Sequence, residues 1–141
     1  MIKKENRFDH NAYRVTFDLD PSVTKLEEGQ SVSLNDSGKL VIADGTKKSY
    51  VAMGSKRAKR DQVTGLPVQK IAVLVGSAIL SISNIDATQT YKAGSPLKVK
   101  ADGVLTLADP DNASTPDKAH KIVGYAHGPL SPSGFLRVEF I

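Results

Sequence analysis

Two segments of the chain, residues 29–44 and 94–109, carry one sequence pattern at a spacing of 65 positions. The first segment reads G-Q-S-V-S-L-N-D-S-G-K-L-V-I-A-D, and the second reads G-S-P-L-K-V-K-A-D-G-V-L-T-L-A-D. The identical positions in this register are Gly29/Gly94, Gly38/Gly103, Leu40/Leu105, Ala43/Ala108 and Asp44/Asp109, and apolar character is kept at Val32/Leu97, Leu34/Val99 and Ile42/Leu107. The shared register predicts that one structural unit occurs twice, although two unrelated hairpins with the same turn chemistry would give a similar pattern.

Each copy of the pattern predicts a β-hairpin with one buried face. The apolar residues alternate, a glycine-containing turn follows, and the alternation then resumes. Gly38 and Gly103 lie where a tight connection requires a positive φ, which glycine adopts without steric cost. Gly29 and Gly94 are expected at the bend into each hairpin.

Several other segments alternate in the same way. Residues 14–20 and 134–141 each place apolar side chains on one face, namely Val15, Phe17 and Leu19 in the first and Leu136, Val138 and Phe140 in the second. The apolar run 71–82 fits either a buried strand pair or one bent strand. Because no window of a dozen residues has helical spacing, we expect an all-β fold, a single small sandwich or barrel that is jelly-roll-like or β-tulip-like and is built on two similar hairpin units.

The chain is expected to form one domain preceded by an arm. Residues 1–11 are polar and show no period, so we expect an extended, flexible N-terminal arm. Residues 12–141 are expected to form a single all-β domain, with the internal repeat at 26–54 and 91–126. Two loops interrupt the strands: a basic loop at 55–67 and a loop rich in turn residues at 109–117.

Composition argues against several classes of protein. The chain has no cysteine, which removes a disulfide scaffold, a thiolate metal site and a cysteine nucleophile. Its three histidines, His10, His120 and His127, are poorly spaced for a shared metal, and no phosphate-binding loop or nucleophile elbow occurs. No signal peptide and no membrane-spanning run are found. We therefore expect no enzyme, no catalytic residue, no cofactor, no metal and no membrane partner.

The net charge of +4 includes a cluster of basic residues at Lys56–Arg60. Clustered lysine and arginine can neutralise nucleic-acid phosphates, so a basic β-barrel that binds nucleic acid is the alternative function. With four tyrosines, four phenylalanines and no tryptophan, however, the chain offers few aromatic rings on which bases could stack. We therefore do not expect nucleic acid as the main partner.

The second copy and the strands that follow it resemble the head-decoration, or cement, proteins of tailed bacteriophages. The shared progression is a glycine-led hairpin, G-S-P-L-K-V-K-A-D-G-V-L-T-L-A-D, then a polar loop, the strand K-I-V-G-Y-A and the closing strand G-F-L-R-V-E-F. The resemblance covers residues 91–141 directly and residues 26–54 through the internal repeat.

This resemblance implies a structural virion protein that is made in the cytoplasm of the bacterial host and binds the outer surface of the assembled capsid. It would clamp neighbouring subunits of the major capsid protein, and a homotrimer or homodimer would match the local symmetry axes. The capsid contacts are expected in the arm and the basic loop, at Lys3, Lys4, Arg7, Phe8, Lys56, Arg57, Lys59 and Arg60. A tail or baseplate structural protein is the alternative within the virion.

Overall fold

The computed structural model describes residues 1–56, 70–118 and 121–141, and for residues 3–11 it describes the backbone only. Within these ranges the chain forms strands and no α-helix, which confirms the all-β class. The strands are β1 (Ile2–Asp18), β2 (Ser31–Leu34), β3 (Leu40–Ile42), β4 (Ser49–Ala52), β5 (Lys70–Ile82), β6 (Pro96–Lys100), β7 (Val104–Leu107), β8 (Gly124–Ala126) and β9 (Leu136–Phe140).

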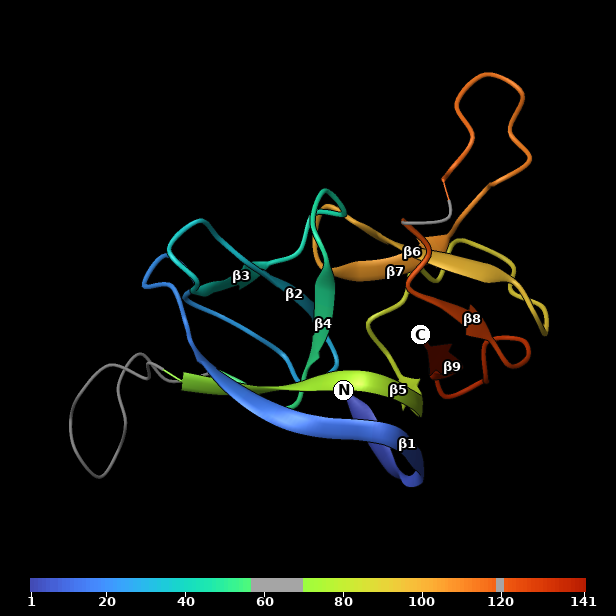
Figure 1. Cartoon of the computed structure of the whole chain (residues 1–141). Helices are drawn as coiled ribbons and strands as arrows, with labels where there is room; N and C mark the ends of the chain where they lie inside the picture. The colour runs from blue at the N-terminus through green and yellow to red at the C-terminus, as the bar shows by residue number, and fades with distance from the viewer. Residues whose placement is uncertain (57–69, 119–120) are drawn as a thin grey trace.

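All the strands belong to one antiparallel sheet that curls into a half-barrel (Figure 1). The order is β3-β2-β4-β5-β9-β8-β6-β7, and β1 pairs with β5. Since β1 follows β5 along nearly its whole length, β4 and β9 must share the opposite edge of β5. The apolar run 71–82 is therefore one strand, and Gly76, at φ 107°, lies at its middle.

The repeated segments contain the hairpins β2–β3 and β6–β7. Their turn glycines have positive φ, 74° at Gly38 and 68° at Gly103, as the sequence predicts. Gly29 and Gly94, before each hairpin, have φ of 93° and 86°. After each hairpin a short strand returns beside its first strand: β4 pairs with β2, and β8 pairs with β6.

The buried side chains form two clusters, which share β5. Ile71 and Val73 belong to a cluster of eight buried residues with β2 and β3, whereas Leu74 and Leu80 belong to a cluster of sixteen with β6 to β9. Odd and even positions of a strand point to opposite faces. The two clusters therefore lie on opposite faces of β5, and neither is complete without that strand.

The N-terminal residues differ from the expected flexible arm. Strand β1 begins at Ile2, whose Cα partner is Ile82 and whose side chain is buried. The pairing with β5 continues to Asp18, with irregularities between Lys3 and Phe8 and further along the strand. An apolar residue at position 2 has a place in the core, and this explains why the backbone pairing extends to the start of the chain although the following sequence is polar.

Candidate functional site

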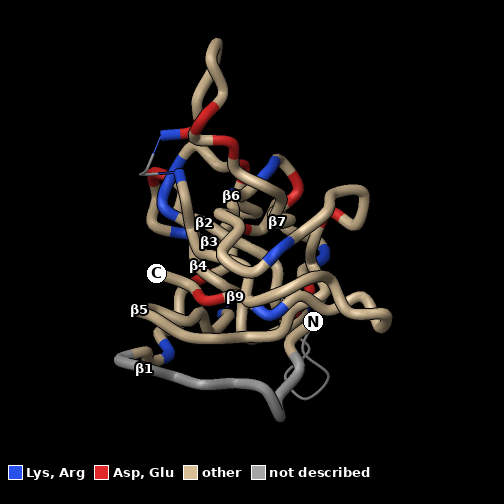
Figure 2. The backbone as a smooth tube through the Cα atoms, turned by 90° about the vertical axis from the view of Figure 1, so that its right-hand side faces the viewer, with Lys and Arg blue, Asp and Glu red and all other residues tan. Residues whose placement is uncertain are grey.

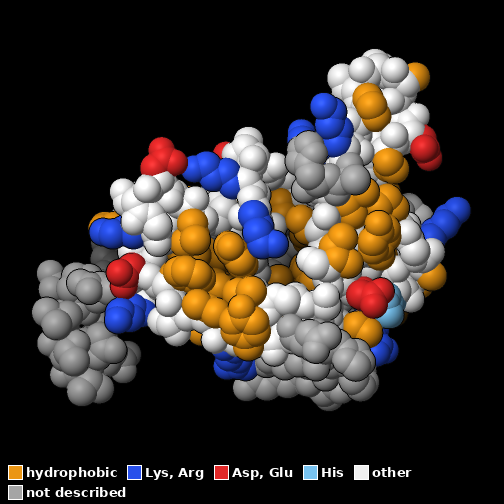
Figure 3. All heavy atoms as spheres, viewed as in Figure 1, with side chains coloured by type: hydrophobic (Ala, Val, Ile, Leu, Met, Phe, Trp, Pro, Cys, Tyr) orange, Lys and Arg blue, Asp and Glu red, His pale blue; other side chains and the backbone are white. Residues whose placement is uncertain are grey.

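A groove opens where β4 and β9 separate along the edge of β5. Strand β4 pairs with β5 at Val73 and Leu74, and β9 pairs with it only from Ala78 onward. Residues 75–77 therefore have neither strand beside them on this edge, a gap of about 10 Å at the usual rise of a strand. The groove has a volume of about 410 Å³. Figure 3 shows this face, with hydrophobic side chains on both sides of a hollow.

The floor of the groove is continuous with the larger hydrophobic cluster. The lining residues are Ser31, 45–51, 74–76, Val99, 121–123, Phe140 and Ile141. Among them Val51, Leu74 and Phe140 are buried members of that cluster. A concave, mostly apolar surface of this size is typical of binding sites.

The charged residues that line the groove are all lysines: Lys47, Lys48 and Lys121. The Lys47 ammonium lies 3.1 Å from an Asp36 carboxylate oxygen, and both side chains are highly exposed, so the pair is weak. The Lys48 ammonium lies 5.8 Å from the centre of the Tyr50 ring, within cation–π range. No aspartate or glutamate is among the lining residues that the structure describes, so the charged side chains that line the groove are all positive.

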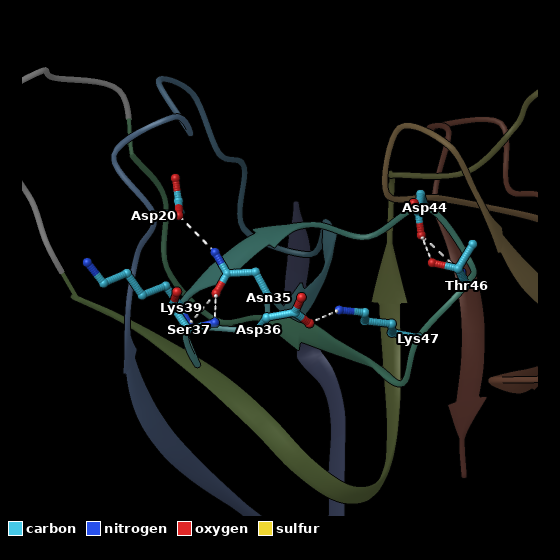
Figure 4. Close-up of polar contacts among 8 residues, drawn as sticks. All are labelled: Asp20, Asn35, Asp36, Ser37, Lys39, Asp44, Thr46 and Lys47. Carbon is cyan, nitrogen blue, oxygen red and sulfur yellow. Dashed lines mark hydrogen bonds and ion pairs between the residues drawn. The ribbon is translucent and has the colours of Figure 1, made fainter.

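The first wall is fixed by polar contacts in the loop between β3 and β4 (Figure 4). One carboxylate oxygen of Asp44 accepts hydrogen bonds from the Thr46 hydroxyl (2.6 Å) and the Thr46 N–H (3.0 Å). These bonds hold the pKa of Asp44 below its usual value. Gly45 has a φ of 87°, and a Cβ there would collide with the Val99 carbonyl. The loop is thus held closely against β6.

The turn between β2 and β3 holds Asp36 near Lys47. The Asn35 amide oxygen accepts hydrogen bonds from the N–H groups of Ser37 and Lys39, both 3.0 Å, and its amide nitrogen donates to Asp20 at 2.8 Å (Figure 4). Asp36 lies inside this closed turn and meets the Lys47 ammonium. The turn around Asn35 therefore fixes the backbone that carries Asp36, and the contact of Asp44 with Thr46 fixes the backbone just before Lys47.

The second wall is held between β6 and the end of β9. The Val123 N–H donates to the Leu97 carbonyl at 2.9 Å, and the Ile141 N–H donates to the Val123 carbonyl at 3.1 Å. Ile141, which lines the groove, is 62% exposed as a residue. An apolar side chain left this accessible beside the buried floor adds to the apolar surface open to a partner.

Lys56 is the one residue expected to contact the capsid whose side chain the structure describes. Its side chain is buried, and its ammonium donates to the Val23 carbonyl at 2.9 Å. Because that group is engaged inside the protein, we leave Lys56 out of the proposed contact. Arg57, Lys59 and Arg60 lie outside the described residues, and Lys3, Lys4, Arg7 and Phe8 lie in β1, where only the backbone is described.

The groove lysines were missing from the residues that the sequence singled out. The sequence signal that could have found them is their position. Lys48 comes directly before β4, and Lys121 comes shortly before β8, which is the strand that corresponds to β4 in the second half of the chain, the half with the hairpin β6–β7. The groove itself depends on how β4 and β9 separate along β5, which no local pattern encodes.

Other kinds of site find little support in the described parts of the chain. No three histidine, aspartate or glutamate side chains gather there as metal ligands. The His127 ring lies 3.3 Å from the Glu139 carboxylate at an exposed position. Likewise, no helix long and apolar enough to cross a membrane occurs within residues 1–56, 70–118 and 121–141.

Comparison of the chain with protein-family models, curated proteins and solved structures finds no match.

Proposed function

We propose that the chain is a structural protein of a tailed-phage virion that binds the outer surface of the assembled capsid and clamps neighbouring major capsid subunits. The proposal rests on residues 91–141, which carry the resemblance to decoration proteins. In support, these residues form one connected part of the sheet, in which β6 pairs with β7 and β8, and β8 pairs with β9. A rigid β surface suits a lattice, where many weak identical contacts add through avidity.

We also propose that the fold is a small barrel built from two copies of one hairpin unit. Corresponding backbone hydrogen bonds support this: the Ala43 N–H donates to Ser31 at 3.0 Å, and the Ala108 N–H donates to Pro96 at 2.9 Å. A barrel is preferred to a sandwich because one sheet curls continuously, without splitting into two layers.

The proposed capsid contact is the N-terminal part of β1, which contains Lys3, Lys4, Arg7 and Phe8. Among the described strands β1 pairs with β5 alone, so its second edge is available for an extended segment of the capsid protein. An open edge binds such a segment through main-chain hydrogen bonds. Basic residues along this edge favour an acidic capsid surface.

Co-sedimentation with expanded capsids that lack the protein tests the proposal. We expect binding to saturate at a copy number that matches one class of symmetry axes. The variant K3E/K4E should lower the occupancy, whereas K25E/K92E, which changes the net charge equally at exposed lysines elsewhere, should not. No binding of the wild type at micromolar concentration would overturn the proposal.

A nucleic-acid-binding barrel is the second candidate, because the groove has three lysines and the Tyr50 ring among its lining residues. It predicts retention of oligonucleotides that falls steeply as salt is raised, since bound phosphates release counterions. Such retention without capsid binding would favour this candidate. Capsid binding with no affinity for oligonucleotides would dismiss it.

A further inference from the structure

A loop of the second half extends away from the body of the protein. It follows β7 and spans residues 109–118, and Figure 1 shows it reaching outward beyond the sheet. Residues 109–116 are all exposed. The corresponding connection in the first half, between β3 and β4, is short and lies against β6. The extended loop therefore makes little use of its surface within its own chain.

The base of this loop is held by charged and backbone contacts. The Lys98 ammonium lies 2.9 and 3.0 Å from the two carboxylate oxygens of Asp117. Asp117 also accepts the Asp109 N–H at 2.7 Å, and its own N–H donates to the Asp109 carbonyl at 3.0 Å. The backbone hydrogen bond from Asp109 and the contact with Lys98 keep the pKa of Asp117 low, so the carboxylate stays ionised at neutral pH.

The outer part of the loop is also ordered by a local turn. The Asn112 amide oxygen accepts hydrogen bonds from the N–H groups of Ser114 and Thr115, both 2.9 Å. Pro110 and Pro116 restrict the backbone on either side. A loop that is ordered before binding loses less conformational entropy when it binds.

The charged side chains of the loop are opposite in sign to those that line the groove. Asp109 and Asp111 offer exposed carboxylates, with the apolar ring of Pro110 between them. The groove offers an apolar floor and three lysines, and no aspartate or glutamate is among its described lining residues. Its Lys47 contact with Asp36 is an exposed pair that an incoming carboxylate can replace at little cost.

We propose that the 109–117 loop of one copy docks into the lysine-lined groove of a second copy. The loop extends away from the sheet that carries the groove of its own chain, which leaves it accessible to another molecule (Figures 1 and 2). The two surfaces differ, so the contact runs head to tail and closes into a ring when the rotation between copies allows it. This goes beyond the proposed function, because self-association can be measured without a capsid.

Sedimentation velocity of the purified protein, from micromolar to millimolar concentration, tests the docking. We expect the wild type to associate. D109K/D111K and K47E/K48E should each weaken association about a hundredfold, because like charges then face each other. K25E/K92E is the matched control for K47E/K48E and should associate as the wild type does.

Mixing gives the sharper test. An equimolar mixture of D109K/D111K and K47E/K48E pairs a native loop with a native groove and an exchanged loop with an exchanged groove, so the two variants should associate with each other although neither associates with itself. A chain with all four substitutions should associate with itself again, because the charges are exchanged. Circular dichroism and thermal unfolding of each variant check that the fold is kept.

A monomeric wild type at every concentration would overturn the docking, as would groove and control variants that associate equally well. Capsid co-sedimentation separates this failure from failure of the proposed function. If K47E/K48E self-associates normally but loses capsid binding, the groove belongs to the capsid contact and the self-docking is wrong.

Discussion

The two halves of the molecule, one around the β2–β3 hairpin and the other around β6–β7, make corresponding backbone hydrogen bonds in different surroundings. The Gly29 N–H donates to Ala52 at 2.8 Å, and the Gly94 N–H donates to Ala126 at 2.7 Å. The Ala52 N–H donates in turn to the Gln30 carbonyl, and the Ala126 N–H donates to the Ser95 carbonyl, both at 2.9 Å. The backbone at the entry to each hairpin is thus nearly the same.

The space around the glycines differs between the halves. At the hairpin turns Gly38 has open space, whereas a Cβ on Gly103 would lie 2.5 Å from the Ser31 carbonyl oxygen. At the entry bends the order is reversed: Gly94 is open, and a Cβ on Gly29 would lie 2.7 Å from the Asn84 side chain. Hydrogen bonding sets the conformation of each glycine, while packing between the halves decides whether a side chain fits.

The largest losses of stability are expected at buried positions that the two halves share. Leu40 and Leu105 are corresponding, fully buried leucines, so alanine at either position should lower the free energy of unfolding by about 2–5 kcal/mol. Both variants should unfold in one transition, because β5 contributes to both hydrophobic clusters. Urea unfolding followed by circular dichroism and by tyrosine fluorescence measures this. Separate transitions for the two probes would show that the halves fold independently.

Substitution of the turn glycines should lower the free energy of unfolding by different amounts in the two halves. Alanine at Gly38 or Gly103 must adopt a left-handed conformation, at a cost of about 1–2 kcal/mol. Gly103→Ala also forces a methyl group against the Ser31 carbonyl, which adds about 1–3 kcal/mol. The difference in free energy of unfolding between the two variants measures the packing between the halves. Equal losses would contradict the close approach at Gly103.

Local pattern is enough to locate both hairpins, the positive φ of Gly38 and Gly103, and the all-β class. It leaves open whether 71–82 is one strand or two, because alternation does not reveal that β5 has neighbours on both edges and hydrophobic clusters on both faces. The basic run 56–60 suggests solvated lysines, yet Lys56 is buried against the Val23 carbonyl. The groove depends on the separation of β4 from β9, a tertiary feature that no local sequence pattern predicts.

At the entry glycines the larger loss of stability should fall in the first half, at Gly29, and the difference between the two variants should be smaller than at the turn glycines. Gly94→Ala carries only the cost of the left-handed conformation, about 1–2 kcal/mol. Gly29→Ala carries the same cost and displaces the Asn84 side chain, which receives a hydrogen bond from the Met1 amino group. The added Cβ also lies 3.0 Å from the Met1 nitrogen and 3.1 Å from the Met1 carbonyl oxygen. A side chain moves more readily than a carbonyl of the sheet, so the extra loss should be under about 1 kcal/mol. A larger loss at Gly94 than at Gly29 would contradict the crowding at Gly29.

The smallest effects concern two corresponding aspartates, Asp20 and Asp86. Their N–H groups donate to the Leu40 and Leu105 carbonyls at 2.9 and 2.8 Å. Hydrogen bonds from the side chain and backbone of Ser22 lower the pKa of Asp20, and those of Thr88 lower the pKa of Asp86, from a usual value of 3.8. The contribution of each carboxylate to stability is therefore present above the unfolded-state pKa and is lost as the pH falls through the folded-state pKa.

Asp20→Asn and Asp86→Asn should each flatten the fall in stability as the pH drops below about 5. Urea midpoints measured from neutral to acidic pH give this slope, and the Asp36→Asn variant, which changes an exposed carboxylate, is the control. The salt response should differ between the two aspartates, because Asp86 lies 3.4 Å from the Lys100 ammonium, whereas Asp20 receives the neutral Asn35 amide and Lys39 contributes only the last of the effects that lower its pKa. Since salt screens ionic contacts more than hydrogen bonds between neutral and charged groups, the acid dependence assigned to Asp86 should weaken more in high salt. An equal salt response at both positions would mean that the ion pair with Lys100 adds nothing beyond what Asn35 and Lys39 give Asp20.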